Sequence, residues 1–274
     1  LSRLVSSVVC GNAMHANELA YRHNIAKLGK QIDRDEWLLP PQTVNAYYNP
    51  ELNEVVFPAA ILQPPLFDAQ ADDAVNYGAI GAIIGHEISH GFDDRGSQFD
   101  DTGNLRVWWT PEDRARFAAK TRILVDEYAA FSPVPGYTID GALTLGENIA
   151  DNSGLAISYK AYQISLDGKP APVIDGYTGD QRFYLGFGQI WQAKRRDKFA
   201  IELVTSDPHS IPIDRVRGTL VNQPDSSKAC DIHPDDTIYA GTEQRTTSWR
   251  WAPYTGRSNQ HHTHQRSARR RLAA

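Results

Sequence analysis

Apolar and polar positions follow two different periods along the chain, and each period predicts its own kind of element. Residues 44–58, VNAYYNPELNEVVFP, form two β-rich runs around a turn at Asn49-Pro50, with Asn53 as a second candidate for the turn. Three prolines between positions 58 and 65 then exclude regular structure until about residue 72. Helical spacing dominates the rest, and we expect helices over residues 15–36, from Asp72 or Asp73 to His90, from Thr110-Pro111 onward, over 144–166 and over 180–203.

The helix predicted to end at His90 is unusually rich in glycine. Each glycine destabilises a helix interior by roughly 1 kcal/mol relative to alanine. Three of them in one helix, Gly78, Gly81 and Gly85, indicate that another element packs very close to its backbone. Gly91 lies just past the expected end, where a residue in the left-handed conformation commonly closes a helix.

The overall composition, 41% hydrophobic and 22% charged residues, is that of a globular protein with a substantial core. No apolar run approaches the length of a membrane span. The chain does not begin with Met and its first residues lack the sustained apolar core of a signal peptide, so we expect the interior of a longer chain. Cys10 and Cys230 are far apart in sequence and are expected to be free thiols; the compartment, cytoplasmic or exported, is left open.

Charge is distributed unevenly, although the formal net charge is only −5. Residues 250–274 hold six arginines, three histidines and no acidic residue, whereas the remaining chain holds 22 basic and 33 acidic residues and carries −11. We therefore expect a body over 1–249 and a separate, disordered basic tail over 250–274. Phosphate contacts through the arginines at 269–271 would make the chain a nucleic-acid binder; this is an alternative, and no nucleic-acid partner is expected.

The segment GHEISHGFDD carries a candidate metal site. His86 and His90 are four positions apart, so on a helix both imidazoles can point at one ion. Glu87 is rotated by about 100° from His86 and therefore flanks the ion, close enough to take a proton from a water molecule. This spacing is typical of zinc hydrolases. The alternative is a pair of surface histidines on a helix.

A tetrahedral catalytic zinc site needs a third protein ligand. GENIAD supplies Glu147, which lies 57 residues after His90 on another predicted helix, although it could equally be an ordinary glutamate at a helix start. Asp151, one turn further along that helix, can hydrogen-bond the free N–H of one ligand histidine. Asp93, three residues past His90, can do the same for the other histidine.

Six blocks in fixed order carry a family resemblance. They are VNAYYNP, NEVVFPAAILQPP, GHEISHGFDD, GENIAD, FYLGFGQIW, and DPHS followed by RVRGTLVN. Together they resemble the neprilysin and endothelin-converting-enzyme family of zinc metallopeptidases, especially its bacterial oligopeptidase-like members. The likeness runs from about residue 15 to Trp249.

The resemblance implies a zinc-dependent endopeptidase that acts on peptide substrates. It implies that His86, His90 and Glu147 bind one zinc ion and that Glu87 is the base that activates water. Asp151 matches an acidic residue that supports a ligand histidine and is often described as a proton donor.

The resemblance also implies how a peptide is bound. His209 resembles the histidine that stabilises the oxyanion, and Arg215 matches an arginine that contacts the substrate backbone. Asn45 and Ala46 resemble the pair that hydrogen-bonds an extended substrate as an added strand. An apolar pocket for the residue after the scissile bond is implied at Leu66, Ile83 and Trp191, so cleavage before a large hydrophobic residue is expected.

The expected fold is α+β and mainly helical, a zincin-type catalytic lobe with a small edge sheet that bears Asn45. Members of the family are far longer, and this chain corresponds to their C-terminal third, so an N-terminal portion that covers the cleft is expected to be missing. This chain reads HSIP where the family commonly has His-Ser-Pro, which would allow the loop of His209 to be displaced. Two interpretations therefore remain: an active zinc endopeptidase, or an inactive zinc-binding fragment that needs the N-terminal portion.

Overall fold

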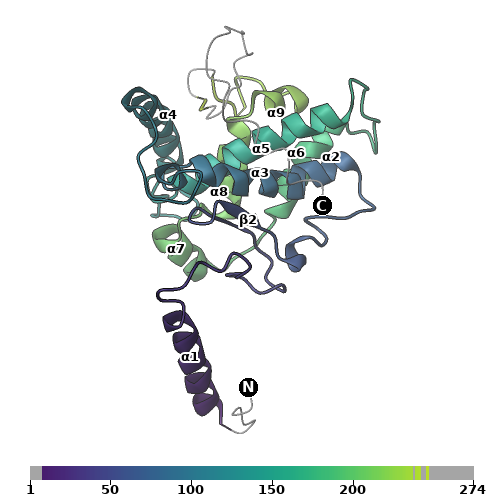
Figure 1. Ribbon diagram of the computed structural model, residues 1–274. Coiled ribbons are helices and arrows are strands. Elements are labelled where there is room, and N and C mark those ends of the chain that lie inside the picture. Colours follow the sequence, from purple (N-terminus) through teal and green to yellow (C-terminus); the bar gives the residue numbers. More distant parts are fainter. Residues whose placement is uncertain (1–7, 237, 242–244, 247–274) are drawn as a thin grey trace, which may run out of the picture.

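The computed structural model describes residues 8–236, 238–241, 245 and 246. Within these residues the protein is mainly helical and carries one two-stranded sheet, which confirms the expected fold class (Figure 1). The elements are α1 Val9–Ile25, β1 Tyr47–Asn49, β2 Glu54–Val56, η1 Ala59–Ile61, α2 Asp73–Asn76, η2 Tyr77–Gly81, α3 Ala82–Ser89, η3 His90–Phe92, η4 Gly96–Gln98, α4 Pro111–Ala129, α5 Leu145–Ser165, α6 Gly179–Ile190, α7 Asp197–Ser206, α8 Pro212–Val221 and α9 Pro224–Ala229. The predicted basic tail, 250–274, lies outside the described residues.

Helix α1 projects away from the body of the molecule (Figure 1) and buries none of its residues. The prediction of a helix over 15–36 was wrong at both ends, because α1 begins at Val9 and stops at Ile25. The chain then turns through Gly29, whose φ of 73° lies in the left-handed region that interrupts a helix. No helix of the described part of the chain combines the length and apolar character that crossing a bilayer requires.

The β-rich segment forms the expected hairpin. Strands β1 and β2 pair antiparallel, with Tyr47 opposite Val56 and Asn49 opposite Glu54. Asn53 ends the turn with a φ of 48°, a left-handed conformation that asparagine tolerates better than most residues. Its side-chain amide donates a hydrogen bond to the carbonyl of Asp101, 3.1 Å away, which ties the turn to a later loop.

The predicted helix from residue 72 to His90 is present but is not uniform. It consists of α2, a π-helical turn η2, and α3, and it continues as the 3₁₀ turn η3. The carboxylate of Asp72 does not cap it, since this side chain accepts a hydrogen bond from Nε of Arg182 at 2.8 Å. Gly91 does not adopt the predicted left-handed conformation; it lies within η3, and a Cβ added there would be 3.2 Å from the hydroxyl of Tyr48.

Gly78 and Gly85 lie where other backbones approach, as predicted, whereas Gly81 lies against the side-chain hydroxyl of Ser158. Helix α3 crosses α5 so closely that a Cβ on Gly85 would be 2.5 Å from the carbonyl oxygen of Gly154. A Cβ on Gly154 would in turn lie 2.3 Å from the backbone nitrogen of His86. Gly78 meets the backbone of Phe183 on α6 in the same way. The metal-binding candidates of α3 are therefore held directly against α5.

Two buried apolar clusters hold the helices around this crossing. The larger cluster joins α2, α3, α5 and α6 through Ala74, Ala82, Leu155, Tyr162, Phe183, Tyr184 and Phe187. A second cluster packs α4 against the start of α5 through Leu124, Tyr128, Ile139 and Ile149. Thr110 caps α4 as expected: its hydroxyl accepts a hydrogen bond from the backbone N–H of Asp113.

The helix predicted over 180–203 is broken into α6 and α7, so this prediction was wrong. Phe183 and Phe187 are buried, but α6 ends at Ile190 and α7 begins only at Asp197. Trp191, directly after α6, stacks on the guanidinium of Arg215, whose Cζ is 3.9 Å from the ring centroid. This contact with α8 holds the chain at the point where the helix stops.

The close crossing predicts that Gly154→Ala destabilises the protein by about 3 kcal/mol, because the new methyl group meets backbone atoms that cannot move aside. Gly188→Ala is the matched control, since it lies in α6 with nothing within 4 Å of the added Cβ. It should leave stability unchanged or raise it by up to about 1 kcal/mol through helix propensity. Urea unfolding followed by circular dichroism measures both, and equal stability of the two variants would contradict the packing described.

Candidate metal centre

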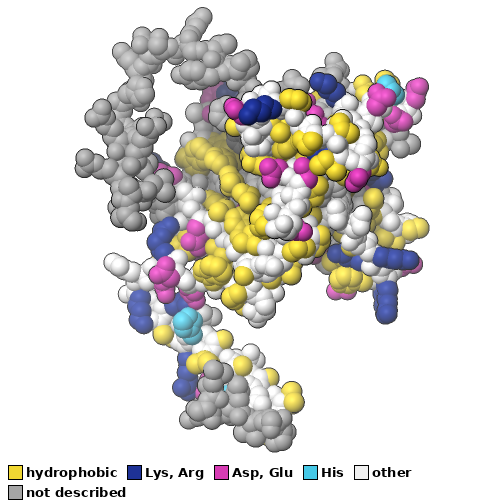
Figure 2. All heavy atoms as spheres, turned by 90° about the vertical axis from the view of Figure 1, so that its right-hand side faces the viewer, with side chains coloured by type: hydrophobic (Ala, Val, Ile, Leu, Met, Phe, Trp, Pro, Cys, Tyr) yellow, Lys and Arg dark blue, Asp and Glu magenta, His cyan; other side chains and the backbone are white. Residues whose placement is uncertain are grey.

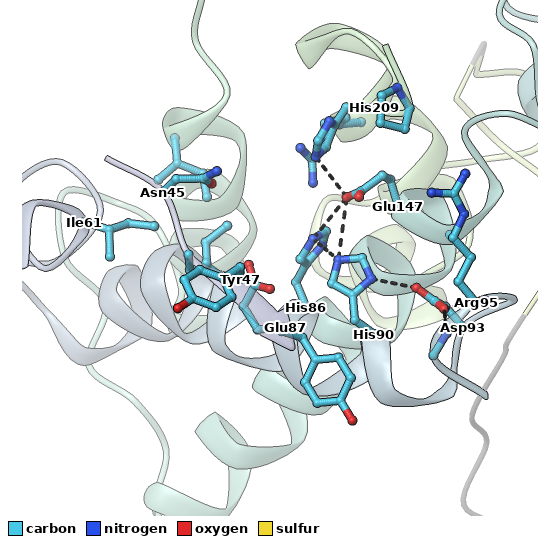
Figure 3. A pocket seen from close by; sticks show the side chains of 18 of the residues that line it. Asn45, Tyr47, Ile61, His86, Glu87, His90, Asp93, Arg95, Glu147 and His209 are labelled. Atoms are coloured by element: carbon cyan, nitrogen blue, oxygen red, sulfur yellow. Dashed lines mark hydrogen bonds and ion pairs between the residues drawn. The ribbon is translucent and has the colours of Figure 1, made fainter. Parts of the chain in front are cut away.

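The side chains of His86 and His90 meet at the end of α3. Their Nε2 atoms are 3.0 Å apart, and the ring planes are nearly perpendicular at 88° (Figure 3). His86 is buried and His90 is partly buried, so both rings face the interior of the cleft rather than bulk solvent. The predicted i, i+4 pair therefore lies close enough to share one ion.

Glu147 approaches the pair from the first turn of α5. Its Oε2 is 3.2 Å from Nε2 of His86 and 3.7 Å from Nε2 of His90. Nε2 of His209 lies 3.1 Å from the same oxygen (Figure 3). Residues far apart in sequence, from α3, α5 and the loop before α8, thus converge at one point.

Each histidine of the pair is oriented by a carboxylate behind it. Oδ1 of Asp151 is 2.8 Å from Nδ1 of His86, and Oδ2 of Asp93 is 2.7 Å from Nδ1 of His90. An ionised carboxylate only accepts hydrogen bonds, so in each neutral ring Nδ1 carries the proton. When both rings are neutral, as metal binding requires, their Nε2 lone pairs face each other and the oxygen of Glu147.

This donor set fits a metal cation. Two lone pairs and a carboxylate oxygen that face one another need either protons or a positive ion between them. Ligand atoms that surround a tetrahedral zinc ion at 2.0–2.1 Å are about 3.3 Å apart. The observed separations of 3.0, 3.2 and 3.7 Å bracket that value. Two imidazoles and one carboxylate are also a donor set that zinc commonly takes.

Glu87 lies on α3 beside the pair. It is 5% exposed, and a carboxylate oxygen of it lies within 4.8 Å of the ligand nitrogens of His86 and His90. Burial raises the pKa of Glu87, while the two histidines act in the opposite direction. The raised pKa gives this carboxylate a greater proton affinity than an exposed glutamate, as a general base requires.

Asp151 is held between a histidine and an arginine. Nε and Nη2 of Arg215 each donate to an oxygen of Asp151 at 2.6 Å. Burial opposes ionisation, but Arg215 and His86 together lower the pKa of Asp151 to about 2. Asp151 is therefore an acceptor for the ring N–H of His86, and this geometry orients the histidine.

The loop that carries His209 is fixed despite its HSIP sequence. Asp207 accepts hydrogen bonds from the backbone N–H and from Nδ1 of His209, both at 2.8 Å. The hydroxyl of Ser210 donates to Oδ1 of Asn148 on α5 at 2.9 Å. Burial lowers the pKa of His209, but Glu147 outweighs burial and the pKa is raised. The loop thus keeps His209 beside Glu147, and the displacement that the sequence allowed does not occur.

A cleft of about 570 Å³ extends from these groups. Asn45 and Ala46 line it just before β1, and among the described residues none hydrogen-bonds to their backbone groups. Leu66, Ile83 and Trp191 line the same cleft and pack together with Ile61 and Ile190. The structure therefore brings the predicted site residues to one cleft, except Asp151, which lies buried behind His86 and does not line it.

Sequence reasoning missed several residues that shape the site. Asp207, two positions before His209, could have been found from the Asx-turn pattern, since aspartate commonly bonds the backbone two residues on. Ile61 and Ile190 carried no separate signal, because isolated apolar residues occur throughout the chain. Arg95 also lines the cleft, and its local sequence gave no reason to place it there.

Two helix-borne imidazoles, a carboxylate from a second helix and an adjacent buried glutamate define the class of zincin-type hydrolases. Residues 45–246 match peptidase family M13, and the chain belongs to this family. Zinc is the metal that the family implies.

The chain is 42% identical over 221 residues to endothelin-converting enzyme 1 of Mus musculus. The aligned region covers 79% of this chain and 28% of that protein. It is 41% identical over 231 residues to neprilysin of Homo sapiens, covering 82% of this chain and 30% of that protein. A zinc metalloprotease of Mycobacterium tuberculosis, solved with an inhibitor, superposes with a TM-score of 0.85 at 50% identity and covers 87% of this chain and 37% of the solved one. The chain thus spans about three tenths of the length of these curated relatives.

The charges around His86 predict that zinc binding releases a proton. Burial alone would lower the pKa of His86, but the hydrogen bonds to Asp151 and Glu147 raise it to about 9. Without metal the ring is therefore protonated at neutral pH, and zinc has to displace that proton. We expect zinc affinity to rise with pH up to about 9, approaching tenfold per pH unit well below that value.

Calorimetric titration with zinc at pH 7.5, in buffers of different ionisation enthalpy, measures the proton count. About one proton should be released from His86 at pH 7.5; this contribution should fall to about half a proton near pH 9 and vanish well above it. A binding enthalpy that is independent of the buffer would contradict the protonation state described here.

Proposed function

We propose that this chain is the catalytic portion of a zinc-dependent endopeptidase that cleaves peptides before a large hydrophobic residue. The observation that carries the proposal is the convergence of His86, His90 and Glu147 at one point, with the buried carboxylate of Glu87 beside it. Membership of peptidase family M13 supports the same reaction class.

In this proposal His86, His90 and Glu147 hold one zinc ion, with Asp151 and Asp93 fixing the two rings. When bound, zinc supplies a Lewis acid that polarises the scissile carbonyl and lowers the pKa of water. Glu87 takes the proton from the attacking water and passes it to the leaving amine, for which its raised pKa is suited.

His209 and Arg215 stabilise the negative charge that develops on the carbonyl oxygen of the substrate. The pKa of His209 is raised, which favours a protonated Nε2 that can donate a hydrogen bond to the oxyanion. Arg215 uses Nε and Nη2 on Asp151, which leaves Nη1 for a substrate carbonyl. Because Arg215 also stacks on Trp191, the same guanidinium connects the ligand histidine with the wall of the cleft.

The substrate binds as an extended strand. The backbone groups of Asn45 and Ala46 pair with the peptide main chain, which gives affinity without selecting a sequence. The side chain after the scissile bond enters the pocket of Leu66, Ile83 and Trp191, which selects large apolar residues. These two contacts fix the register of the scissile bond against Glu87.

A second candidate is a zinc-binding unit whose activity requires additional chain. Two observations favour it. The chain covers only 28% and 30% of the two curated relatives described above. Large apolar side chains are also exposed, and Figure 2 shows hydrophobic side chains gathered over the body on the face it presents. Surfaces of this kind commonly pack against another segment or protein.

The central prediction of the proposed chemistry concerns Glu87→Gln. This variant should bind zinc with unchanged stoichiometry but hydrolyse peptides about 10²–10⁴-fold more slowly, because the amide cannot accept the proton of water. The matched control is Glu202→Gln, an exposed glutamate of α7 outside the cleft, which should keep full activity. A fluorogenic peptide with a hydrophobic residue after the scissile bond provides the assay.

The same assay separates the two candidates. Hydrolysis by the zinc-loaded native chain supports the endopeptidase, and equal rates for native protein and Glu87→Gln would refute the role of Glu87. A native chain that binds zinc but is inactive until an N-terminal portion of a relative is added would instead support the second candidate.

A further inference from the structure

Arg95 stands at one end of the cleft and takes no part in the chemistry proposed above. It is exposed, lies between η3 and η4, and lines the same cavity as the metal ligands. Figure 3 shows its side chain on the opposite side of the histidine pair from Asn45 and Ile61. The apolar pocket and the cation thus lie on either side of the metal ligands.

The backbone of Arg95 is fixed by the carboxylate that also orients a metal ligand. Oδ1 of Asp93 accepts hydrogen bonds from the N–H groups of Arg95 and Gly96, at 2.8 and 2.6 Å, while its Oδ2 faces Nδ1 of His90. A Cβ on Gly96 would lie 1.7 Å from the carbonyl oxygen of His90, so the turn is pressed against the end of the zinc helix. The position of Arg95 relative to the metal centre is therefore set by packing and not by a free loop.

The guanidinium of Arg95 is available to bind a ligand, although its charge also acts on the nearby Asp94. Among the residues that the structure describes, none forms a hydrogen bond or ion pair with it. Arg215, the other arginine that lines the cleft, is buried and committed to Asp151. Arg95 is accordingly the accessible arginine of this cleft in the described part of the chain.

Neighbouring acidic residues do not neutralise Arg95 by direct pairing. Asp93 uses both oxygens on His90 and on the two backbone N–H groups. Asp94 turns toward the start of α5, where its Oδ1 would be 2.9 Å from a Cβ on Gly146. The cation is thus presented to the cleft, where the geometry of a guanidinium suits a carboxylate partner.

We propose that Arg95 is a specificity-determining residue that selects peptides with an aspartate or glutamate on the amino-terminal side of the scissile bond. The inference rests on the proposed peptidase function, which places the residue after the scissile bond in the apolar pocket. An extended peptide advances about 3.3 Å per residue, so residues before the bond run from the metal ligands toward Arg95. A carboxylate one to three positions before the bond then reaches the guanidinium.

The test measures binding and cleavage separately. The zinc-loaded Glu87→Gln chain is titrated with nine fluorescent peptides of one parent sequence. Each carries Glu, Gln or Lys at one of the three positions before the scissile bond, and Kd is read by fluorescence anisotropy. The same peptides are then assayed for hydrolysis by the native chain. Each measurement is repeated with Arg95→Gln, Arg95→Lys and Arg95→Glu, and with Arg106→Gln as the control, an exposed arginine outside the cleft.

At one of the three positions the Glu peptide should bind about three- to ten-fold more tightly than the Gln peptide at low salt. This Glu-to-Gln preference should disappear in Arg95→Gln, persist in part in Arg95→Lys and remain unchanged in Arg106→Gln. Arg95→Glu should instead bind the Lys peptide most tightly. It should also shrink as salt is raised, because the pair is partly exposed.

A Glu-to-Gln ratio of about one at all three positions, or a preference that survives Arg95→Gln, overturns the proposal, as does failure of every peptide to bind. Failure of the native chain to hydrolyse peptides that do bind would count against the proposed activity instead. The binding ratios would still decide the role of Arg95.

Discussion

The contact between the backbones of α3 and α5 determines where His86, Asp151 and Glu147 lie relative to one another. It exists because Gly85 and Gly154 face each other without side chains, which lets the carbonyl of one helix approach the other at van der Waals distance. His86 follows Gly85 directly, and Asp151 and Glu147 precede Gly154 by one and two turns. The crossing therefore sets the three proposed parts of the metal site in one register: the histidine, the carboxylate that orients it and the third ligand.

Charge is arranged around this crossing in alternating order. Arg215 neutralises Asp151, Asp151 orients His86, and Glu147 faces the histidines from the other side. The burial of these groups would be costly if any partner were missing, since buried charges need to be paired. Because Arg215 also stacks on Trp191, the network that orients His86 extends into the wall of the cleft. In the function we propose, one buried arginine would thereby couple metal binding to substrate recognition.

Much of the site could be predicted from sequence because its signals are local. The spacing of His86 and His90 defines a shared helix face, and the glycines of the same segment correctly indicated a close backbone neighbour. Glu147 could not be chosen from spacing alone, since a glutamate at a helix start is common; the ordered family blocks and then the distance to His86 distinguished it.

The features that sequence reasoning missed depend on residues that are distant in the chain. Asp72 fails to cap its helix because it pairs with Arg182, 110 positions later. The break after α6 accompanies a contact between Trp191 and α8, and the conformation of Gly91 follows from a 3₁₀ turn beside Tyr48. Sequence periodicity predicts where an isolated helix forms. The ends of these helices depend on tertiary contacts, which a local sequence pattern does not indicate.

The most direct measurement is zinc retention against a chelator by the native chain and by Glu147→Ala, with Glu112→Ala, a first-turn glutamate of α4, as the matched control. The structure predicts one zinc per native chain and per control chain, and at least about a hundredfold weaker retention when the carboxylate at 147 is removed. Equal zinc retention by all three proteins would show that this carboxylate is not a ligand and would contradict the site at its centre.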